Sequence, residues 1–162
     1  MNDQTDVPAG ILIPTTPEEA ARGYTVTRSF RAPRQLVWDA FTQPDQLGQW
    51  FGPVESHLEG TQLDVRVGGS WSTTMVIPGM GDIPWQGTFL EVDEPAHLVM
   101  TLNDQGVLND LYDVWTIDLA EADGGTHLTL RQRGGHLDDE QYEQARQGTA
   151  GFLERIATLL GE

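Results

Sequence analysis

The sequence predicts an α+β fold, in which a curved antiparallel sheet of about six strands holds one long C-terminal helix. Two short helices are expected directly after the first strand, because prolines divide that part of the chain into helical units. The later strands follow one another through short turns, which is typical of an antiparallel sheet. The final segment carries apolar residues at helical spacing, which predicts a helix with one buried face.

The first strand and the two helices are marked by alternation and by proline. Residues 24–30 alternate in character, which predicts a strand. Pro33 opens a helix, and Pro44 ends it because a proline disfavours the helical conformation in the residue before it. A second short helix follows and is expected to stop at Gly52-Pro53.

The middle of the chain consists of strand-like segments separated by turn residues. Gly60 interrupts the first of these segments, which is consistent with a bulge, and Gly68-Gly69 is a tight hairpin signal. The expected strands cover residues 54–58 with 63–67, 70–77, 85–92, 97–102, 111–120 and 126–133.

The last helix has a clear start and an apolar stripe. Asp138 and Gln141 form a capping-box pattern, so the helix is expected to begin there and to run to Leu160. Gly148 and Gly151 lie inside it, and each glycine costs about 1 kcal/mol relative to alanine. We therefore expect a steric reason for them, either close contact with the sheet or volume left for a cavity.

Composition limits the classes of function. The 162 residues are sufficient for one domain, expected over residues 24–162 after a flexible N-terminal arm, residues 1–23. The net charge of −16, with nine Arg and no Lys, disfavours nucleic acids and anionic membranes as partners. The chain has no Cys and its acidic N-terminus lacks the pattern of a signal peptide, so a cytoplasmic protein is expected. No metal or nucleotide motif is present, so no cofactor or metal is expected.

Five landmarks occur in a fixed order: Phe30 to Pro44, Trp50 to Pro53, Asp64 to Trp71, Gly87 to Glu91, and Gly125 to Leu128 before the last helix. Together they resemble the START-like (SRPBCC) superfamily, and within it the branch of the activator of the heat-shock protein 90 ATPase. The resemblance covers roughly residues 24–160. It implies a helix-grip fold, with a cavity between sheet and helix that binds small apolar or amphipathic molecules.

The residues expected to line such a cavity are mostly large and apolar. Aromatic rings offer a large contact area, and an indole N–H can orient a polar ligand atom. Asp113 is the exception, because strand parity places its carboxyl group on the same face as Trp115. The expected ligand-binding residues are Trp71, Met75, Trp85, Met100, Asp113, Trp115 and Phe152.

Three functions stay open. The absence of a recognisable catalytic set favours a non-enzymatic binder of a small molecule, acting as a monomer or a homodimer. An enzyme of the cyclase, hydratase or hydrolase kind would use Asp113, Arg28 or Tyr112. A chaperone-interaction module rests on the family resemblance alone, and no segment corresponds to the additional chaperone-binding domain of the eukaryotic activators.

Overall fold

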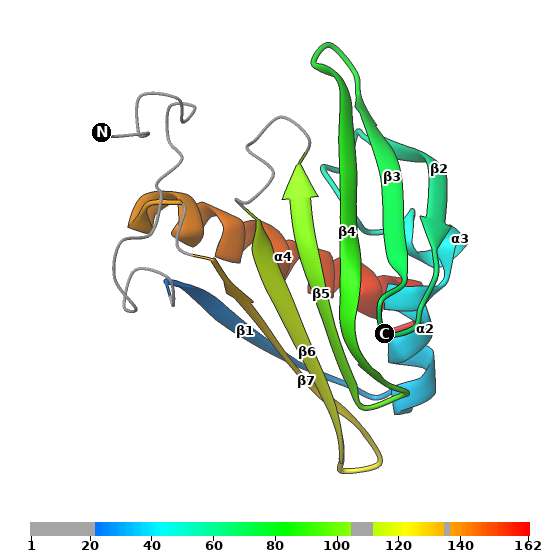
Figure 1. Ribbon diagram of the computed structural model, residues 1–162. Helices are drawn as coiled ribbons and strands as arrows, with labels where there is room; N and C mark the ends of the chain where they lie inside the picture. Colours follow the sequence, from blue (N-terminus) through cyan, green and yellow to red (C-terminus); the bar gives the residue numbers. More distant parts are fainter. Residues whose placement is uncertain (1–21, 105–111, 135–136) are drawn as a thin grey trace.

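A computed structural model describes residues 22–104, 112–134 and 137–162 of the chain (Figure 1). The predicted α+β helix-grip architecture is confirmed, and the described residues form seven strands in one antiparallel sheet. Most of the expected N-terminal arm lies outside the described residues. The strands are β1 (Gly23–Phe30), β2 (His57–Leu63), β3 (Ser70–Ile77), β4 (Gly81–Asp93), β5 (His97–Asp104), β6 (Asp113–Ala122) and β7 (Gly125–Arg133), and the helices are α2 (Arg34–Thr42), α3 (Pro44–Leu47) and α4 (Asp139–Leu159).

The strand order in the sheet is β1-β7-β6-β5-β4-β3-β2, so only β1 leaves the sequential order. It pairs with β7 in the register Tyr24↔Gln132 and Phe30↔Thr126. Figure 1 shows α4 crossing one face of the sheet, with α2 and α3 at one end of that face. We call the face toward α4 the inner face and the opposite one the outer face.

The capping box that starts α4 is confirmed. The Asp138 carboxylate accepts a hydrogen bond from the Gln141 backbone N–H at 2.7 Å, and Gln141 Oε1 accepts one from the Asp138 N–H at 2.8 Å. The expected steric reason for the helix glycines is wrong. Gly148 and Gly151 are exposed, and a Cβ added at either would meet no described atom within 4 Å.

The bulge near Gly60 is confirmed, since the register of β2 against β3 shifts between Glu59 and Gln62. Gly60 has a φ of +66°, a conformation that favours glycine. The expected strand over residues 63–67 ends at Leu63 instead. The chain turns there, with the Asp64 N–H donating to the Ser70 carbonyl at 2.9 Å.

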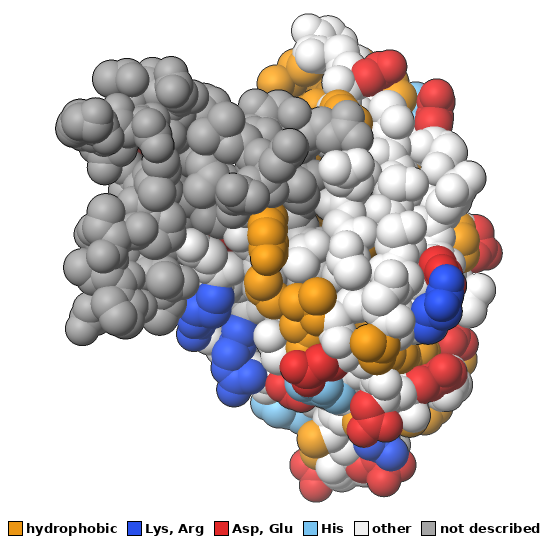
Figure 2. Space-filling view, in the orientation of Figure 1, with side chains coloured by type: hydrophobic (Ala, Val, Ile, Leu, Met, Phe, Trp, Pro, Cys, Tyr) orange, Lys and Arg blue, Asp and Glu red, His pale blue; other side chains and the backbone are white. Residues whose placement is uncertain are grey.

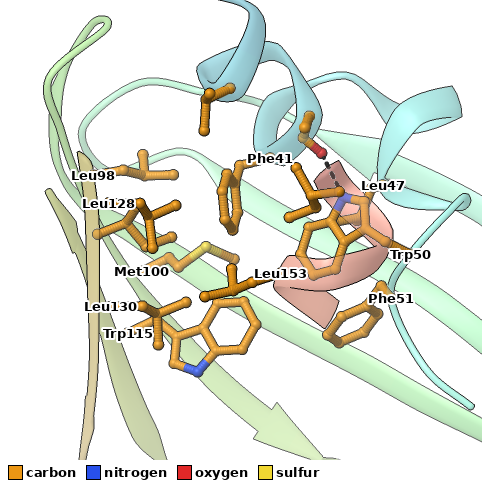
Figure 3. Packing of buried hydrophobic residues seen from close by; sticks show 14 of the residues in the cluster. Phe41, Leu47, Trp50, Phe51, Leu98, Met100, Trp115, Leu128, Leu130 and Leu153 are labelled. Atoms are coloured by element: carbon orange, nitrogen blue, oxygen red, sulfur yellow. Dashed lines mark hydrogen bonds between the residues drawn. The ribbon is translucent and has the colours of Figure 1, made fainter. Parts of the chain in front are cut away.

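The core lies between the inner face of the sheet and the helices. Trp50 connects α2 to the sheet. Its indole N–H donates to the Ala40 carbonyl of α2 at 2.8 Å, and its ring stacks on that of Trp115 in β6 with the centroids 6.4 Å apart. Figure 3 shows Trp50 and Phe51 on the helical side, the strand residue Trp115 across from them, and Leu153 of α4 beside these rings. The segment after α3 therefore closes the core against both the sheet and α4.

Candidate functional site

Seven rings meet between the inner face and α4, and we call them the aromatic cluster. Phe51 is its centre, because five other rings lie around it. Its ring centroid is 5.4 Å from that of Trp85 and 6.2 Å from that of Trp71, both in edge-to-face arrangements. The cluster consists of Phe41, Trp50, Phe51, Trp71, Trp85, Trp115 and Phe152.

A tight backbone turn places Phe51 at this centre. Gly52 has a φ of +102°, and a Cβ there would lie 2.7 Å from the terminal methyl of Met75. Only glycine combines this conformation with so close an approach to β3. The turn ends the helical segment after α3 and leaves the Phe51 ring inside, where only 7% of the residue is exposed.

Arg155 fastens this turn to α4. Its guanidinium donates to the Gly52 carbonyl at 2.5 Å and lies 5.3 Å from the centre of the Phe152 ring. Burial lowers the pKa of the Arg155 guanidinium, but arginine stays charged at neutral pH. The cation therefore holds one side of the aromatic cluster in a fixed position.

Trp85 carries a polar group that has no partner in the described part of the protein. Its indole Nε1 is buried, yet no hydrogen-bond acceptor lies within reach among those residues. A buried donor without an acceptor costs about 1–3 kcal/mol, and such groups in native proteins call for an explanation. The Trp85 ring belongs to the aromatic cluster, so this donor lies beside an apolar surface.

A hydrogen-bonded network of buried polar side chains adjoins the aromatic cluster at Trp115. Asp113 is only 5% exposed and accepts from Gln132 Nε2 at 2.5 Å and from the Tyr142 hydroxyl at 3.1 Å. Gln132 Oε1 in turn accepts from Trp115 Nε1 at 2.9 Å and from the Tyr24 hydroxyl at 2.6 Å. The network thus joins three strands to α4.

The Tyr24 hydroxyl is the other end of this network. It lies 2.6 Å from the Thr149 hydroxyl of α4, and its own proton goes to Gln132. Burial raises the pKa of the Tyr24 phenol above its ordinary value. The hydroxyl therefore keeps its proton at neutral pH and acts as a fixed donor.

The structure brings most of the predicted site residues together. Trp71, Trp85, Trp115 and Phe152 all lie around Phe51. Three others adjoin them: Met75 beside Gly52, Met100 opposite Trp115 in the sheet, and Asp113 in the polar network. That these residues bind a ligand stays a prediction.

Two residues considered for catalysis lie outside the aromatic cluster and the polar network beside it. Arg28 forms an ion pair with Glu154 of α4 at 2.6 Å. Tyr112 is 41% exposed and lines a groove on the outer face of the sheet. Of the three side chains proposed for an enzyme, only Asp113 is a buried group beside the aromatic cluster.

The sequence interpretation missed Phe51 and Gln132 as central residues. Strand parity contained the signal for Gln132, because Leu128 and Leu130 share its face of β7. Phe51 follows a helix of four residues, where no periodicity indicates the direction of a side chain.

The described residues give no indication of a metal centre or a membrane span. No group of three or more His, Asp or Glu side chains converges in this part of the chain in a way that could hold a metal ion. None of the described helices is long and apolar enough to cross a bilayer.

Comparisons with solved structures agree with the fold. A protein from Chromobacterium violaceum is 25% identical, with a TM-score of 0.75 over 84% of this chain and 94% of that chain. A protein from Arthrobacter aurescens is 19% identical, with a TM-score of 0.75 over 93% and 92%. An AHSA1-like protein from Aeromonas hydrophila is 21% identical, with a TM-score of 0.69 over 85% and 94%.

None of the curated proteins compared with the chain matches it. A family model does match, and it covers residues 31–161, nearly the whole of the described domain. The START-like fold of this family commonly binds hydrophobic ligands. The chain belongs to the family described as Activator of Hsp90 ATPase homolog 1-like protein.

Proposed function

We propose that the protein binds one small apolar or amphipathic molecule between the inner face of the sheet and α4. The observation that carries this proposal is the buried Trp85 N–H, which has no acceptor among the described residues although it lies within the aromatic cluster. An acceptor atom on a bound molecule would satisfy it. The surrounding rings would supply the apolar contact area.

The residues around this donor define the chemistry of the ligand. Its apolar body would lie against the rings around Phe51, and a carbonyl, ether or hydroxyl oxygen would accept from Trp85 Nε1. The Asp113 carboxyl group and the net charge of −16 disfavour a carboxylate on the ligand. We therefore expect a neutral amphipathic molecule with an oxygen acceptor.

The hydrogen-bonded network gives the site a rigid wall. Gln132 of β7 and Tyr142 of α4 donate to Asp113, and Tyr24 of β1 in turn donates to Gln132, so the position of the carboxyl group is fixed before any ligand arrives. A site that needs little ordering on binding loses less conformational entropy. We infer that the network positions Trp115, through its bond to Gln132, as part of the binding surface.

Two measurements test the proposal. Native mass spectrometry of the purified protein should detect a co-purified small molecule that is released on denaturation. Nile red, a neutral dye with a ring system and one carbonyl oxygen, should bind with increased fluorescence. Trp85→Phe keeps an apolar ring but removes the donor, so it should weaken Nile red binding by about tenfold, the effect of one buried hydrogen bond.

Trp38→Phe is the matched control, because Trp38 is buried on α2 outside the aromatic cluster. It should leave the affinity for Nile red unchanged. The proposal fails if the protein carries no molecule and binds no dye, or if the two substitutions weaken binding equally while both variants stay folded.

A further inference from the structure

The outer face of the sheet carries a groove of about 610 Å³, on the opposite side from the aromatic cluster. This volume lies within the range of small-molecule sites, about 300–1,000 Å³. Its walls come from the outward-facing residues of β3, β4 and β5 and from the start of β6. The described lining residues are Ser70, Trp71, Ser72, Gln86, Gly87, Thr88, Leu90, Thr101 and Tyr112.

The groove lies where β4 and β5 are not joined by ordinary sheet pairing. The paired positions pass from Gln86↔Asn103 directly to Phe89↔Met100. Between them, the Thr88 N–H donates to the Thr101 hydroxyl at 2.8 Å, and the Thr101 carbonyl accepts from Trp71 Nε1 at 2.9 Å. The Thr88 N–H and the Thr101 carbonyl thus both bond to side chains at this position of the sheet.

Gly87 allows this interruption of the pairing between β4 and β5. A Cβ at Gly87 would lie 2.1 Å from the Thr101 carbonyl oxygen and 2.3 Å from Trp71 Nε1, so no other residue fits. Trp71 and Gly87 belong to the inner face by strand parity, yet both line the outer groove. They form its floor, and the outward-facing hydroxyl and amide side chains form its walls.

The chemical character of the groove differs from that of the whole chain. The net charge is −16, but none of the described lining residues is charged. Figure 2 shows this outer face, where white and some hydrophobic side chains cover the middle and the acidic side chains lie mainly toward its margins. Among the described lining residues, an anionic ligand would find no cation and a cationic ligand would find no carboxylate.

We propose that this outer groove is a second binding site, for a neutral saccharide. Serine and threonine hydroxyls both donate and accept, and the Gln86 amide does the same, which matches the adjacent hydroxyls of a sugar ring. Leu90 and Tyr112, 43% and 41% exposed, add the apolar surface that the C–H face of a sugar requires.

Trp71 connects the groove to the interior. Trp71 is among the lining residues but only 1% exposed; its indole N–H donates to the carbonyl of Thr101, another lining residue, and its ring lies 6.2 Å from Phe51 in the aromatic cluster. A sugar that contacts the floor changes the surroundings of this indole. In an NMR spectrum of the full chain, the Trp71 indole N–H should therefore shift when the groove is filled, and Trp71→Phe identifies that signal.

The test is a titration of the purified protein with cellobiose and maltose, with glucose 6-phosphate and glucosamine as charged comparisons. At least one neutral disaccharide should bind with a dissociation constant on the order of 1 mM or tighter. Gln86→Ala and Tyr112→Ala should each weaken binding at least about fivefold, because each removes one wall of the groove. Thr74→Ala is the control, since Thr74 lies on the outer face of β3 beyond the groove lining.

Three outcomes would overturn the proposal: no disaccharide binds, a charged sugar binds more tightly than the neutral ones, or Thr74→Ala weakens binding as much as Gln86→Ala does. The proposal is independent of the inner site. Trp85→Phe should leave saccharide binding unchanged, so failure of one site is distinguishable from failure of the other.

Discussion

Replacing Phe51 by leucine tests whether ring contacts hold the aromatic cluster together. Phenylalanine and leucine gain similar free energy on burial, so most of the loss comes from ring geometry. Phe51 contacts five rings, and an aromatic pair contributes about 0.5–1.5 kcal/mol beyond its buried area. We take the lower value for each of the five pairs. Because the contributions of neighbouring pairs are not fully additive, the free energy of unfolding should fall by about 2 kcal/mol.

Urea denaturation followed by circular dichroism measures this loss. The slope of the unfolding free energy against urea concentration should be the same in the wild type and the variant, which shows that both unfold by the same transition. In a chain of this length the melting temperature should fall by about 4–8 °C. Phe89→Leu is the control, because Phe89 is fully buried and forms no ring pair with the described residues. A loss at Phe51 no larger than the loss at Phe89 would refute the reasoning.

Three further substitutions test the two helix glycines and a histidine on the outer face. Gly148→Ala and Gly151→Ala should each raise the free energy of unfolding by about 0.5–1 kcal/mol, because both positions are exposed and helical; a decrease in urea stability would contradict this. His97 lies 2.6 Å from Asp118 and 2.8 Å from Glu91, and these two carboxylates raise its pKa. Since folding raises this pKa, the stabilisation is complete below about pH 6.5 and is lost as pH rises through the folded value. His97→Gln should therefore cost about 0.5–1 kcal/mol near pH 5.5 and less near pH 8.5, and an equal cost at both would count against the ion pairs.

Strand positions were the most predictable part of the site. A strand has a period of two, so Asp113 and Trp115 could be assigned to the buried face of one strand from their spacing alone. The same reasoning gives Trp71 and Met75 on β3. The fold itself was predictable because proline, glycine and capping residues mark nearly every boundary.

Turn geometry was not predictable in the same way. The position of Phe51 depends on the φ of Gly52, and a sequence pattern gives no direction for a side chain at such a turn. The outer groove lies at the interruption of the pairing between β4 and β5, and no residue pattern predicts where such an interruption occurs. The amphipathic pattern predicts that residues face one side of an element, but not where neighbouring elements separate.

A steric reason was expected for the two helix glycines because the polar character of the helix face that carries them was not considered. Gly151 lies one turn from Gln147 and from Glu154, both polar and exposed. This neighbourhood indicates a solvent-facing position, where a glycine needs no steric reason. The steric explanation of the two glycines was therefore wrong.

The pairing of β1 with β7 has a consequence for how the domain forms. Tyr24 and Gln132 are 108 positions apart in the chain, and contacts of such long separation slow folding. During synthesis, β1 leaves the ribosome before β7, its one neighbour among the described strands, exists, so the edge that pairs with β7 stays open until residues 125–133 follow. The strands of the sheet therefore cannot all pair in the order in which they are synthesised. Its sheet is completed only when nearly the whole chain is available, and conditions that stall synthesis before β7 should leave an aggregation-prone strand.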